Sequence, residues 1–145
     1  MKPKSVLLVD DDIDDREFFI EALDAIENVN LFGVANNGKE ALDLLTNSVS
    51  LPDHIFMDFN MPVMNGIECL TEMEKNQKTR EIPVVILSGS IEQAGSARKL
   101  GAGFIKKSAD IQALRTDLHR IINLNITVDY LILDQQVPVK SLGAT

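Results

Sequence analysis

Short apolar runs alternate along the chain with segments whose apolar residues recur at helical spacing. The runs lie at residues 5–9, 29–34, 54–57, 83–87 and 103–105. Between them, apolar residues recur every three or four positions, as they do within residues 18–26, 41–45, 67–73, 94–100 and 111–122. Strands that alternate with helices predict an α/β domain with a parallel sheet. Right-handed crossovers then place helices on both faces of that sheet.

Two helix starts can be read directly from the sequence. Asn37 and Asn65 each stand at the beginning of a helical stripe, with Glu40 and Glu68 three residues further on. An Asn that accepts a hydrogen bond from the first turn, followed by such a Glu, is a typical N-terminal cap. Asp12 is expected to cap the first helix in the same way.

Composition narrows the class of protein. The chain has 145 residues, which fits one domain, and its net charge of −8 argues against a general nucleic-acid binder. It has no apolar run of the roughly 18–20 residues that a membrane helix requires. Its one cysteine, Cys69, cannot form an internal disulfide, so we expect a cytoplasmic protein in which Cys69 is a core residue.

Acidic residues follow two of the predicted strands. Asp10 and Asp11 come directly after the first apolar run, and Asp58 closes the third. The carboxyl ends of parallel strands lie at one edge of a sheet, so these carboxylates are expected to meet and to attract a hard divalent cation such as Mg²⁺ or Mn²⁺. Ser88 ends the fourth run and Lys107 follows the fifth, which adds a hydroxyl and an ammonium to the same edge.

This combination of groups suits phosphoryl transfer. Carboxylates that hold Mg²⁺ neutralise charge on an incoming phosphoryl group, and a lysine can pair with its oxygens. A carboxylate is also one of the side chains that form covalent phosphoryl intermediates, and Asp58 is placed to do so.

Four separated motifs resemble the receiver domain of two-component response regulators. They are Val9-Asp10-Asp11 with Arg16, Asp58-Phe59-Asn60-Met61-Pro62 with Asn65-Gly66, Leu87-Ser88-Gly89, and Phe104-Ile105-Lys106-Lys107. They occur in the family's order, and the resemblance covers about residues 4–124. It implies a flavodoxin-like (βα)5 fold with a five-stranded parallel sheet in the strand order 2-1-3-4-5.

The resemblance also implies a role for each site residue. Asp58 would accept a phosphoryl group from a sensor histidine kinase or a histidine phosphotransfer protein. Mg²⁺ would be held by Asp11, Asp58 and the backbone carbonyl of Asn60, with Asp10 acting mainly through water. Lys107 would bind the phosphoryl group.

Signal output is the second implication of the resemblance. Ser88 and Phe104 would form a coupled switch that alters the surface made by the fourth helix, fifth strand and fifth helix. A downstream protein or a second copy of the chain would bind that surface. We therefore expect a stand-alone signalling receiver rather than an enzyme acting on a separate substrate.

Two departures from the family pattern surround Lys107. The segment Gly101-Ala102-Gly103 before Phe104 is one residue shorter than usual, so we expect a tighter loop. Ser108 replaces the usual proline, which makes a cis peptide bond unexpected and leaves Ser108 as a possible cap of the last helix. Lys106 is the alternative to Lys107 for binding phosphate.

Simpler interpretations exist for several of these residues. The side chains of Asp14, Asp15 and Glu17 are expected on a solvated helix face, and His54 is expected to be structural or exposed. Phe104 could be ordinary core, and Ser88 a turn residue.

Three other functions compete with this interpretation. A dehalogenase-like phosphatase would need an Asp where Asn60 stands, because an amide cannot act as a general acid. A flavodoxin would need a phosphate-binding first loop, which three consecutive aspartates would oppose. A pseudo-receiver that binds partners without phosphorylation is disfavoured because the whole constellation is present.

The segment 125–145 lies outside the repeating pattern. Ile126, Val128, Tyr130 and Ile132 alternate with other residues as in a strand, and residues 134–136 could turn the chain before Val137-Pro138-Val139. We expect either an arm that docks on its own domain or on a second copy, or a frayed terminus.

Overall fold

The computed structural model describes residues 2–128 and 136–138. A five-stranded parallel sheet has the strand order β2-β1-β3-β4-β5, which confirms the expected flavodoxin-like α/β fold. The strands are β1 (Lys4–Val9), β2 (Val29–Ala35), β3 (His54–Asp58), β4 (Val84–Ser88) and β5 (Gly103–Lys106). The helices are α1 (Ile13–Asp24), α2 (Gly38–Asn47), α3 (Gly66–Glu74), α4 (Ala94–Lys99) and α5 (Ile111–Leu124), and the short 3-10 helix η1 (Ile91–Gln93) precedes α4.

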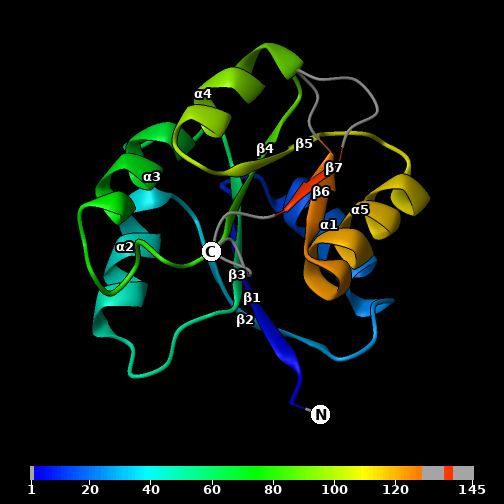
Figure 1. Cartoon of the computed structure of the whole chain (residues 1–145), viewed down its shortest axis with the longest axis horizontal. Helices are drawn as coiled ribbons and strands as arrows, with labels where there is room; N and C mark the ends of the chain where they lie inside the picture. Colours follow the sequence, from blue (N-terminus) through cyan, green and yellow to red (C-terminus); the bar gives the residue numbers. More distant parts are fainter. Residues whose placement is uncertain (1, 129–135, 139–145) are drawn as a thin grey trace.

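The helices form two layers on opposite faces of the sheet. In Figure 1, α2 and α3 lie to the left of the strands with α4 above them, and α1 and α5 lie to the right. β3 is the central strand, and all five of its residues are buried. Its alternating side chains divide the core, with Ile55 and Met57 facing α2–α4 and Phe56 facing α1 and α5.

The helix caps follow the sequence closely. Asn37 accepts a hydrogen bond from the amide of Glu40, and Asn65 forms a full capping box with Glu68. Asp12 caps α1 by accepting from the amide of Asp15. The expectation that Ser108 caps the last helix is wrong: Asp110 is the N-cap of α5, and Ser108 instead accepts a hydrogen bond from the Asp110 amide.

Gly66 brings the start of α3 against the end of β3. A Cβ atom at this position would lie 2.8 Å from the carbonyl oxygen of Asp58, which is too close for any side chain. The Gly66 amide donates to the carbonyl of Phe59 at 2.8 Å. The glycine therefore lets α3 pack tightly behind the loop that follows Asp58.

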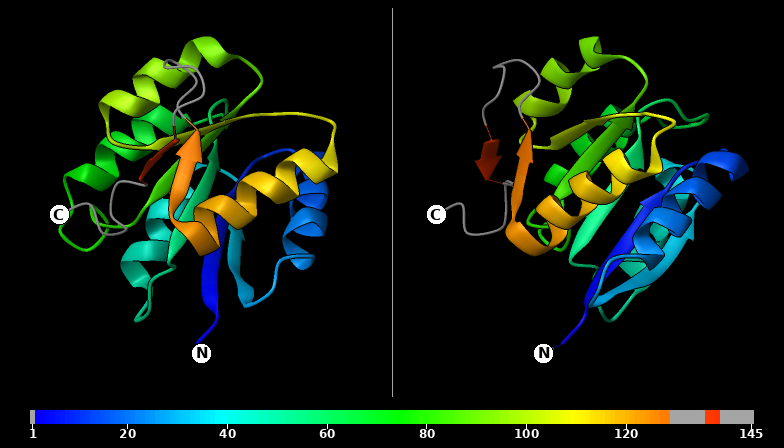
Figure 2. Two further views of the ribbon diagram at one scale, coloured as in Figure 1. Left: turned by 45° about the vertical axis from the view of Figure 1, so that its right-hand side comes forward. Right: turned by 90° about the vertical axis from the view of Figure 1, so that its right-hand side faces the viewer.

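Part of the segment after α5 forms a strand pair. β6 (Ile126–Val128) and β7 (Gln136–Pro138) pair in antiparallel fashion, so the strand expectation is right for residues 126–128, 137 and 138. Gln136, expected in a turn, belongs to β7, whereas Asp134 and Gln135 lie outside the described residues. β6 contacts both β5 and α5, and it runs beside them in Figure 2.

In the part of the chain that the structure describes, no helix combines the length and the apolarity needed to cross a bilayer.

Candidate phosphoryl-transfer site

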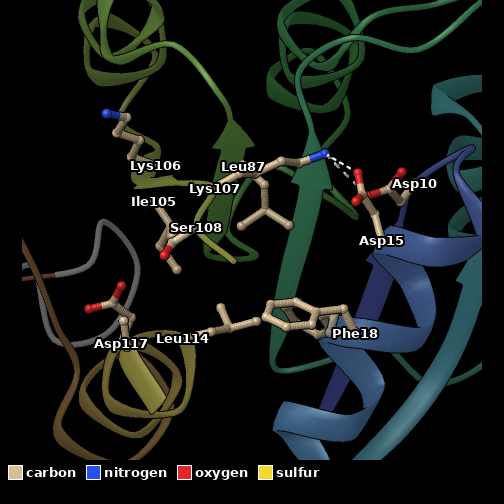
Figure 3. A pocket seen from close by; sticks show the side chains of 12 residues that line it. Asp10, Asp15, Phe18, Leu87, Ile105, Lys106, Lys107, Ser108, Leu114 and Asp117 are labelled. Atoms are coloured by element: carbon tan, nitrogen blue, oxygen red, sulfur yellow. Dashed lines mark hydrogen bonds and ion pairs between the residues drawn. The ribbon is translucent and has the colours of Figure 1, made fainter. Parts of the chain in front are cut away.

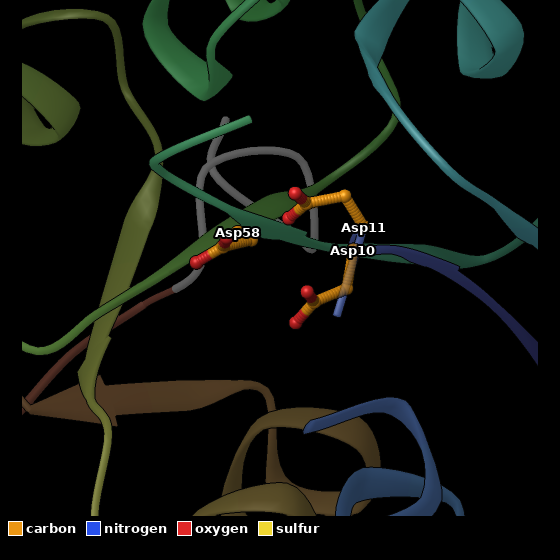
Figure 4. A group of neighbouring side chains, drawn as sticks. All are labelled: Asp10, Asp11 and Asp58. Atoms are coloured by element: carbon orange, nitrogen blue, oxygen red, sulfur yellow. The ribbon is translucent and has the colours of Figure 1, made fainter. Parts of the chain in front are cut away.

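Three carboxylates meet at the carboxyl edge of the sheet. One oxygen from each of Asp10, Asp11 and Asp58 lies within 4.8 Å of the others, and Figure 4 shows the group. Asp10 and Asp58 are buried, whereas Asp11 is exposed to solvent. The expected gathering of acidic groups from β1 and β3 is therefore present, and its hard oxygen atoms fit a divalent cation.

Lys107 extends into this acidic group from the loop after β5. Its Nζ lies 2.8 Å from Oδ1 of Asp58 and 3.7 Å from Oδ2 of Asp10. The Lys107 amide donates to the carbonyl of Ser88 at 2.7 Å, which ties the loop to the end of β4. Lys106, the alternative lysine, is exposed and ends β5. The backbone around Lys107 contains no cis peptide bond.

Burial alters the ionisation of these groups. Burial raises the pKa of Asp10 to about 6, although the Asp12 amide and Lys107 both oppose the shift. Burial likewise raises the pKa of Asp58, and the hydrogen bond from Lys107 opposes it. Burial alone would lower the pKa of Lys107, but hydrogen bonds to Asp15 and Asp58 raise it overall, so this lysine stays a cation.

Arg16 fixes the loop that carries the acidic pair. Its guanidinium donates to the backbone carbonyl of Asp10 at 3.1 Å and to the side chain of Asn36. The Asp10 carboxylate in turn accepts from the amide of Asp12 at 3.0 Å. Arg16 thereby links the ends of β1 and β2 and orients the turn in which Asp10 and Asp11 lie.

Ser88 and Phe104 lie on neighbouring strands and on the same face of the sheet. Ser88 pairs in register with Lys106, and Phe104 pairs with Ile86, two residues earlier on β4. Both side chains are buried, and Phe104 belongs to the core that faces α2–α4. The Ser88 hydroxyl donates to the side chain of Gln93, next to the start of α4, and accepts from the Ser90 amide at 3.1 Å.

Two contacts of the site were missed in the sequence. Asp15, expected on a solvated face, lies 2.7 Å from Nζ of Lys107 and is only partly exposed. Its place in the first turn of α1, next to the acidic edge, was the available signal. Gln93, the acceptor for Ser88, carried no signal that distinguishes it from a surface glutamine.

An apolar pocket lies beside the acidic group, between α1 and α5. It has a volume of about 70 Å³. Figure 3 shows Phe18 of α1 facing Leu114 of α5 across the pocket, with Lys107 reaching to Asp10 and Asp15 along one side. A small apolar recess thus borders the charged groups.

Asn60 is the remaining predicted metal ligand. It is exposed and follows Asp58 by two residues in the loop before α3. Its backbone carbonyl is the group that the family resemblance implies as a metal ligand.

Comparison with known proteins agrees with this geometry. Residues 6–119 match the family model of the response regulator receiver domain. The chain is 37% identical over 134 residues to a protein-glutamate methylesterase/protein-glutamine glutaminase of Desulfotalea psychrophila, a match that covers 84% of this chain and 35% of that protein. It is 31% identical over 121 residues to the nitrate/nitrite response regulator NarL of Escherichia coli, covering 82% of this chain and 55% of NarL. The chain thus spans about a third to a half of these curated relatives.

Solved structures give the same result. The phosphorylated cyanobacterial phytochrome response regulator RcpA superposes with a TM-score of 0.74 at 28% identity, covering 83% of this chain and 94% of that one. The chemotaxis response regulator CheY4 of Vibrio cholerae superposes with a TM-score of 0.71 at 27% identity, covering 83% of this chain and 99% of that one. The family match over residues 6–119, the shared fold and the acidic edge with its lysine show that this chain belongs to the response regulator receiver domain family.

Proposed function

We propose that this receiver domain accepts a phosphoryl group on Asp58. The observation that carries the proposal is the position of Asp58 at the end of the central strand, with Oδ1 2.8 Å from Nζ of Lys107 and two further carboxylates beside it. A buried carboxylate with a fixed cation next to it is suited to attack phosphorus, because the cation stabilises the charge that gathers on the phosphoryl oxygens.

The transfer would take place in one displacement. An Asp58 oxygen attacks phosphorus, a new O–P bond forms, and the bond from phosphorus to the donor breaks. When the donor is a phosphohistidine, the P–N bond breaks, its electron pair stays on the imidazole nitrogen, and the leaving imidazole takes up a proton from water. Lys107 moves no proton in this scheme, since its raised pKa keeps it charged.

The residues present fit Mg²⁺ or Mn²⁺ as the metal of this site. Asp11 and Asp58 would hold the ion with the carbonyl of Asn60, and Asp10 would act mainly through water. The metal supplies positive charge that offsets the repulsion between carboxylates and phosphoryl oxygens. The exposed position of Asp11 leaves one side of the site open for a donor.

The phosphodonor would be a sensor histidine kinase or a histidine phosphotransfer protein. Asp58 is 6% exposed, so a donor must bring its phosphoryl group to the edge of the sheet. The pocket between α1 and α5 borders Asp10 and Lys107 and offers an apolar contact for a side chain of that donor.

Output would use the surface formed by α4, β5 and α5. Ser88 would turn from Gln93 toward the phosphoryl group, and Phe104, on the same face of the sheet, would respond to that movement. A downstream protein or a second copy of the chain would bind the altered surface. Residues 4–124 would form the receiver and residues 125–145 a C-terminal extension, in which β6 contacts β5 and α5.

The proposal is tested by incubating the protein with Mg²⁺ and acetyl phosphate and measuring the intact mass. Wild type should gain one phosphoryl group, and Asp58→Asn should gain none. Asp14→Asn is the matched control, because Asp14 is an exposed aspartate of α1 and should label like wild type. Full labelling of Asp58→Asn would refute the assignment of the phosphoacceptor.

A further inference from the structure

Lys107 is shared between carboxylates that come from three different elements. Its Nζ lies 2.7 Å from Oδ2 of Asp15 on α1, 2.8 Å from Oδ1 of Asp58 on β3, and 3.7 Å from Oδ2 of Asp10 after β1. The contacts to Asp15 and Asp10 are drawn in Figure 3. The Asp15 contact is as short as the one to the proposed phosphoacceptor, although Asp15 belongs to none of the family's motifs in this sequence.

Asp15 is held less firmly than the other two carboxylates. Its side chain is 47% exposed, against 9% for Asp58 and 2% for Asp10. Lys107 is the one partner of its carboxylate among the described residues. A half-exposed pair of this kind is easily exchanged for water.

We propose that Asp15 is a positioning residue that competes with Asp58, and with the phosphoryl group on it, for Lys107. The proposal rests on the proposed function of Asp58. In the unphosphorylated protein, Asp15 draws the ammonium toward α1 and takes one of its three N–H donors. The ion pair between Asp15 and Lys107 therefore has to break before Lys107 can give this donor to the phosphoryl group.

The charges set the direction of this exchange. Phosphorylation replaces the single negative charge of the Asp58 carboxylate with about −2 on the phosphoryl group, whose three oxygens accept hydrogen bonds at the end of β3. The ammonium is then attracted more strongly to the phosphoryl group than to the partly hydrated carboxylate of Asp15. Lys107 turns to the phosphoryl oxygens, and Asp15 is released to solvent at the first turn of α1.

Asp15 competes with the site for Lys107, and it is not needed to hold Lys107 there. Without Asp15, Lys107 still faces the buried carboxylates of Asp10 and Asp58, which hold it in the site. Removing the charge of Asp15 therefore leaves Lys107 in place and makes its donors more available to phosphate.

The test compares labelling of Asp58 by acetyl phosphate in wild type, Asp15→Asn and the control Asp14→Asn. Asp15→Asn should be labelled about threefold faster and should lose the phosphoryl group more slowly, as expected for relief of one half-exposed ion pair. Asp14→Asn removes the same charge from the neighbouring position, where no ion pair with Lys107 exists among the described residues, and should label at the wild-type rate.

A second comparison shows whether Asp15 acts through Lys107. Against a Lys107→Met background, Asp15→Asn should no longer change the labelling rate. A double-mutant cycle on urea unfolding of the unphosphorylated protein supplies a readout independent of the chemistry. It should show a coupling between Asp15 and Lys107, and none between Asp14 and Lys107.

Four results would overturn the inference. They are an unchanged rate in Asp15→Asn, an equal acceleration in Asp14→Asn, the same acceleration in the Lys107→Met background, and zero coupling between Asp15 and Lys107 in the unfolding cycle. Failure of wild type itself to take up phosphoryl mass would instead remove the proposed function, and with it this inference.

Discussion

The two ends of β3 bury an ionisable side chain in opposite ways. His54 begins the strand and is fully buried, and neither ring nitrogen has a hydrogen-bond partner of normal geometry in the part of the chain that the structure describes. Asp58 ends the strand four residues later, equally enclosed, but beside Lys107 and two other carboxylates. Both side chains face the α1–α5 side of the sheet, so the face alone does not explain the difference.

The comparison shows what distinguishes a reactive end from a structural one. Burial lowers the pKa of His54 to about 4, and the nearby Lys4 adds to this effect, whereas Asp53 and the Ile121 backbone oppose it. The imidazole is therefore neutral and packs near Phe56, with ring centroids 6.4 Å apart. At the other end, burial raises the pKa of Asp58 and the charge of Lys107 opposes this shift. Ionisable groups perturbed in this way are typical of reactive sites.

The largest expected effect concerns His54. Its folded pKa of about 4 lies below its ordinary value of 6.5, so protons bind the unfolded chain first as the pH falls. The contribution of neutral His54 to the unfolding free energy is fully present above pH 6.5 and is lost as the pH falls through 4, a loss of about 3 kcal/mol through this residue alone. His54→Leu should remove that part of the pH dependence in urea unfolding. If both proteins lose the same stability between neutral and acid pH, His54 is not buried in its neutral form.

Asp10 should show the opposite sign in the same pH window. Its folded pKa of about 6 lies above the ordinary 3.8, so its contribution is present at low pH and is lost as the pH rises through 6. The expected loss is about 3 kcal/mol, which Asp10→Asn should abolish when unfolding is measured with a chelator present. The profiles of Asp10→Asn and His54→Leu should then depart from wild type in opposite directions. Parallel profiles would show that the two ends of the sheet do not differ in this respect.

Metal should act on the carboxyl end alone. At a concentration about ten times the dissociation constant, Mg²⁺ should stabilise wild type by about 1.4 kcal/mol, seen as a higher melting temperature. His54→Leu should keep this shift, because His54 lies at the opposite end of β3, and Asp11→Asn should lose most of it. A shift of equal size in Asp11→Asn would place the ion elsewhere.

The smallest expected effect concerns backbone strain after Asp58. Val63 has a φ of 71°, and the amide of Met64 donates to the carbonyl of Pro62 at 2.8 Å, which forms a tight turn that a β-branched residue disfavours. Val63→Gly should raise the unfolding free energy by up to about 1 kcal/mol. Val49 is the control, since it is fully exposed and its φ is not positive, so Val49→Gly should bring no gain. Equal effects of the two substitutions in urea unfolding would show that the loop stores no strain.

The sequence predicted the fold well because its signals are local. Apolar runs mark the strands within two residues, and Asn37 and Asn65 cap helices through neighbours three positions away. The gathering of Asp10, Asp11 and Asp58 could also be predicted, since parallel strands share one carboxyl edge.

What sequence reasoning missed depends on how elements lie side by side. Asp15 meets Lys107 across a separation of 92 residues, through the lateral position of α1 relative to the loop after β5. Hydrophobic periodicity predicts which face of a helix is buried. It does not predict which residue of another element a half-exposed side chain at the helix end will contact. Gln93 was missed for the same reason, because its partner Ser88 is fixed by the path of the loop between β4 and α4.

The division of the core by the sheet has a consequence for how this chain can be altered. Leu45 and Leu70 pack on the side of α2–α4, and Leu118 and Ile122 pack on the side of α1 and α5, with the strands between them. Among the described residues these two groups of side chains belong to separate core clusters, so the effects of substitutions on opposite sides should add. The side chains on one face of the sheet can therefore be substituted without repacking those on the other face. The α1–α5 side, which carries the pocket, can acquire a new partner while the side that holds Phe104 keeps its packing.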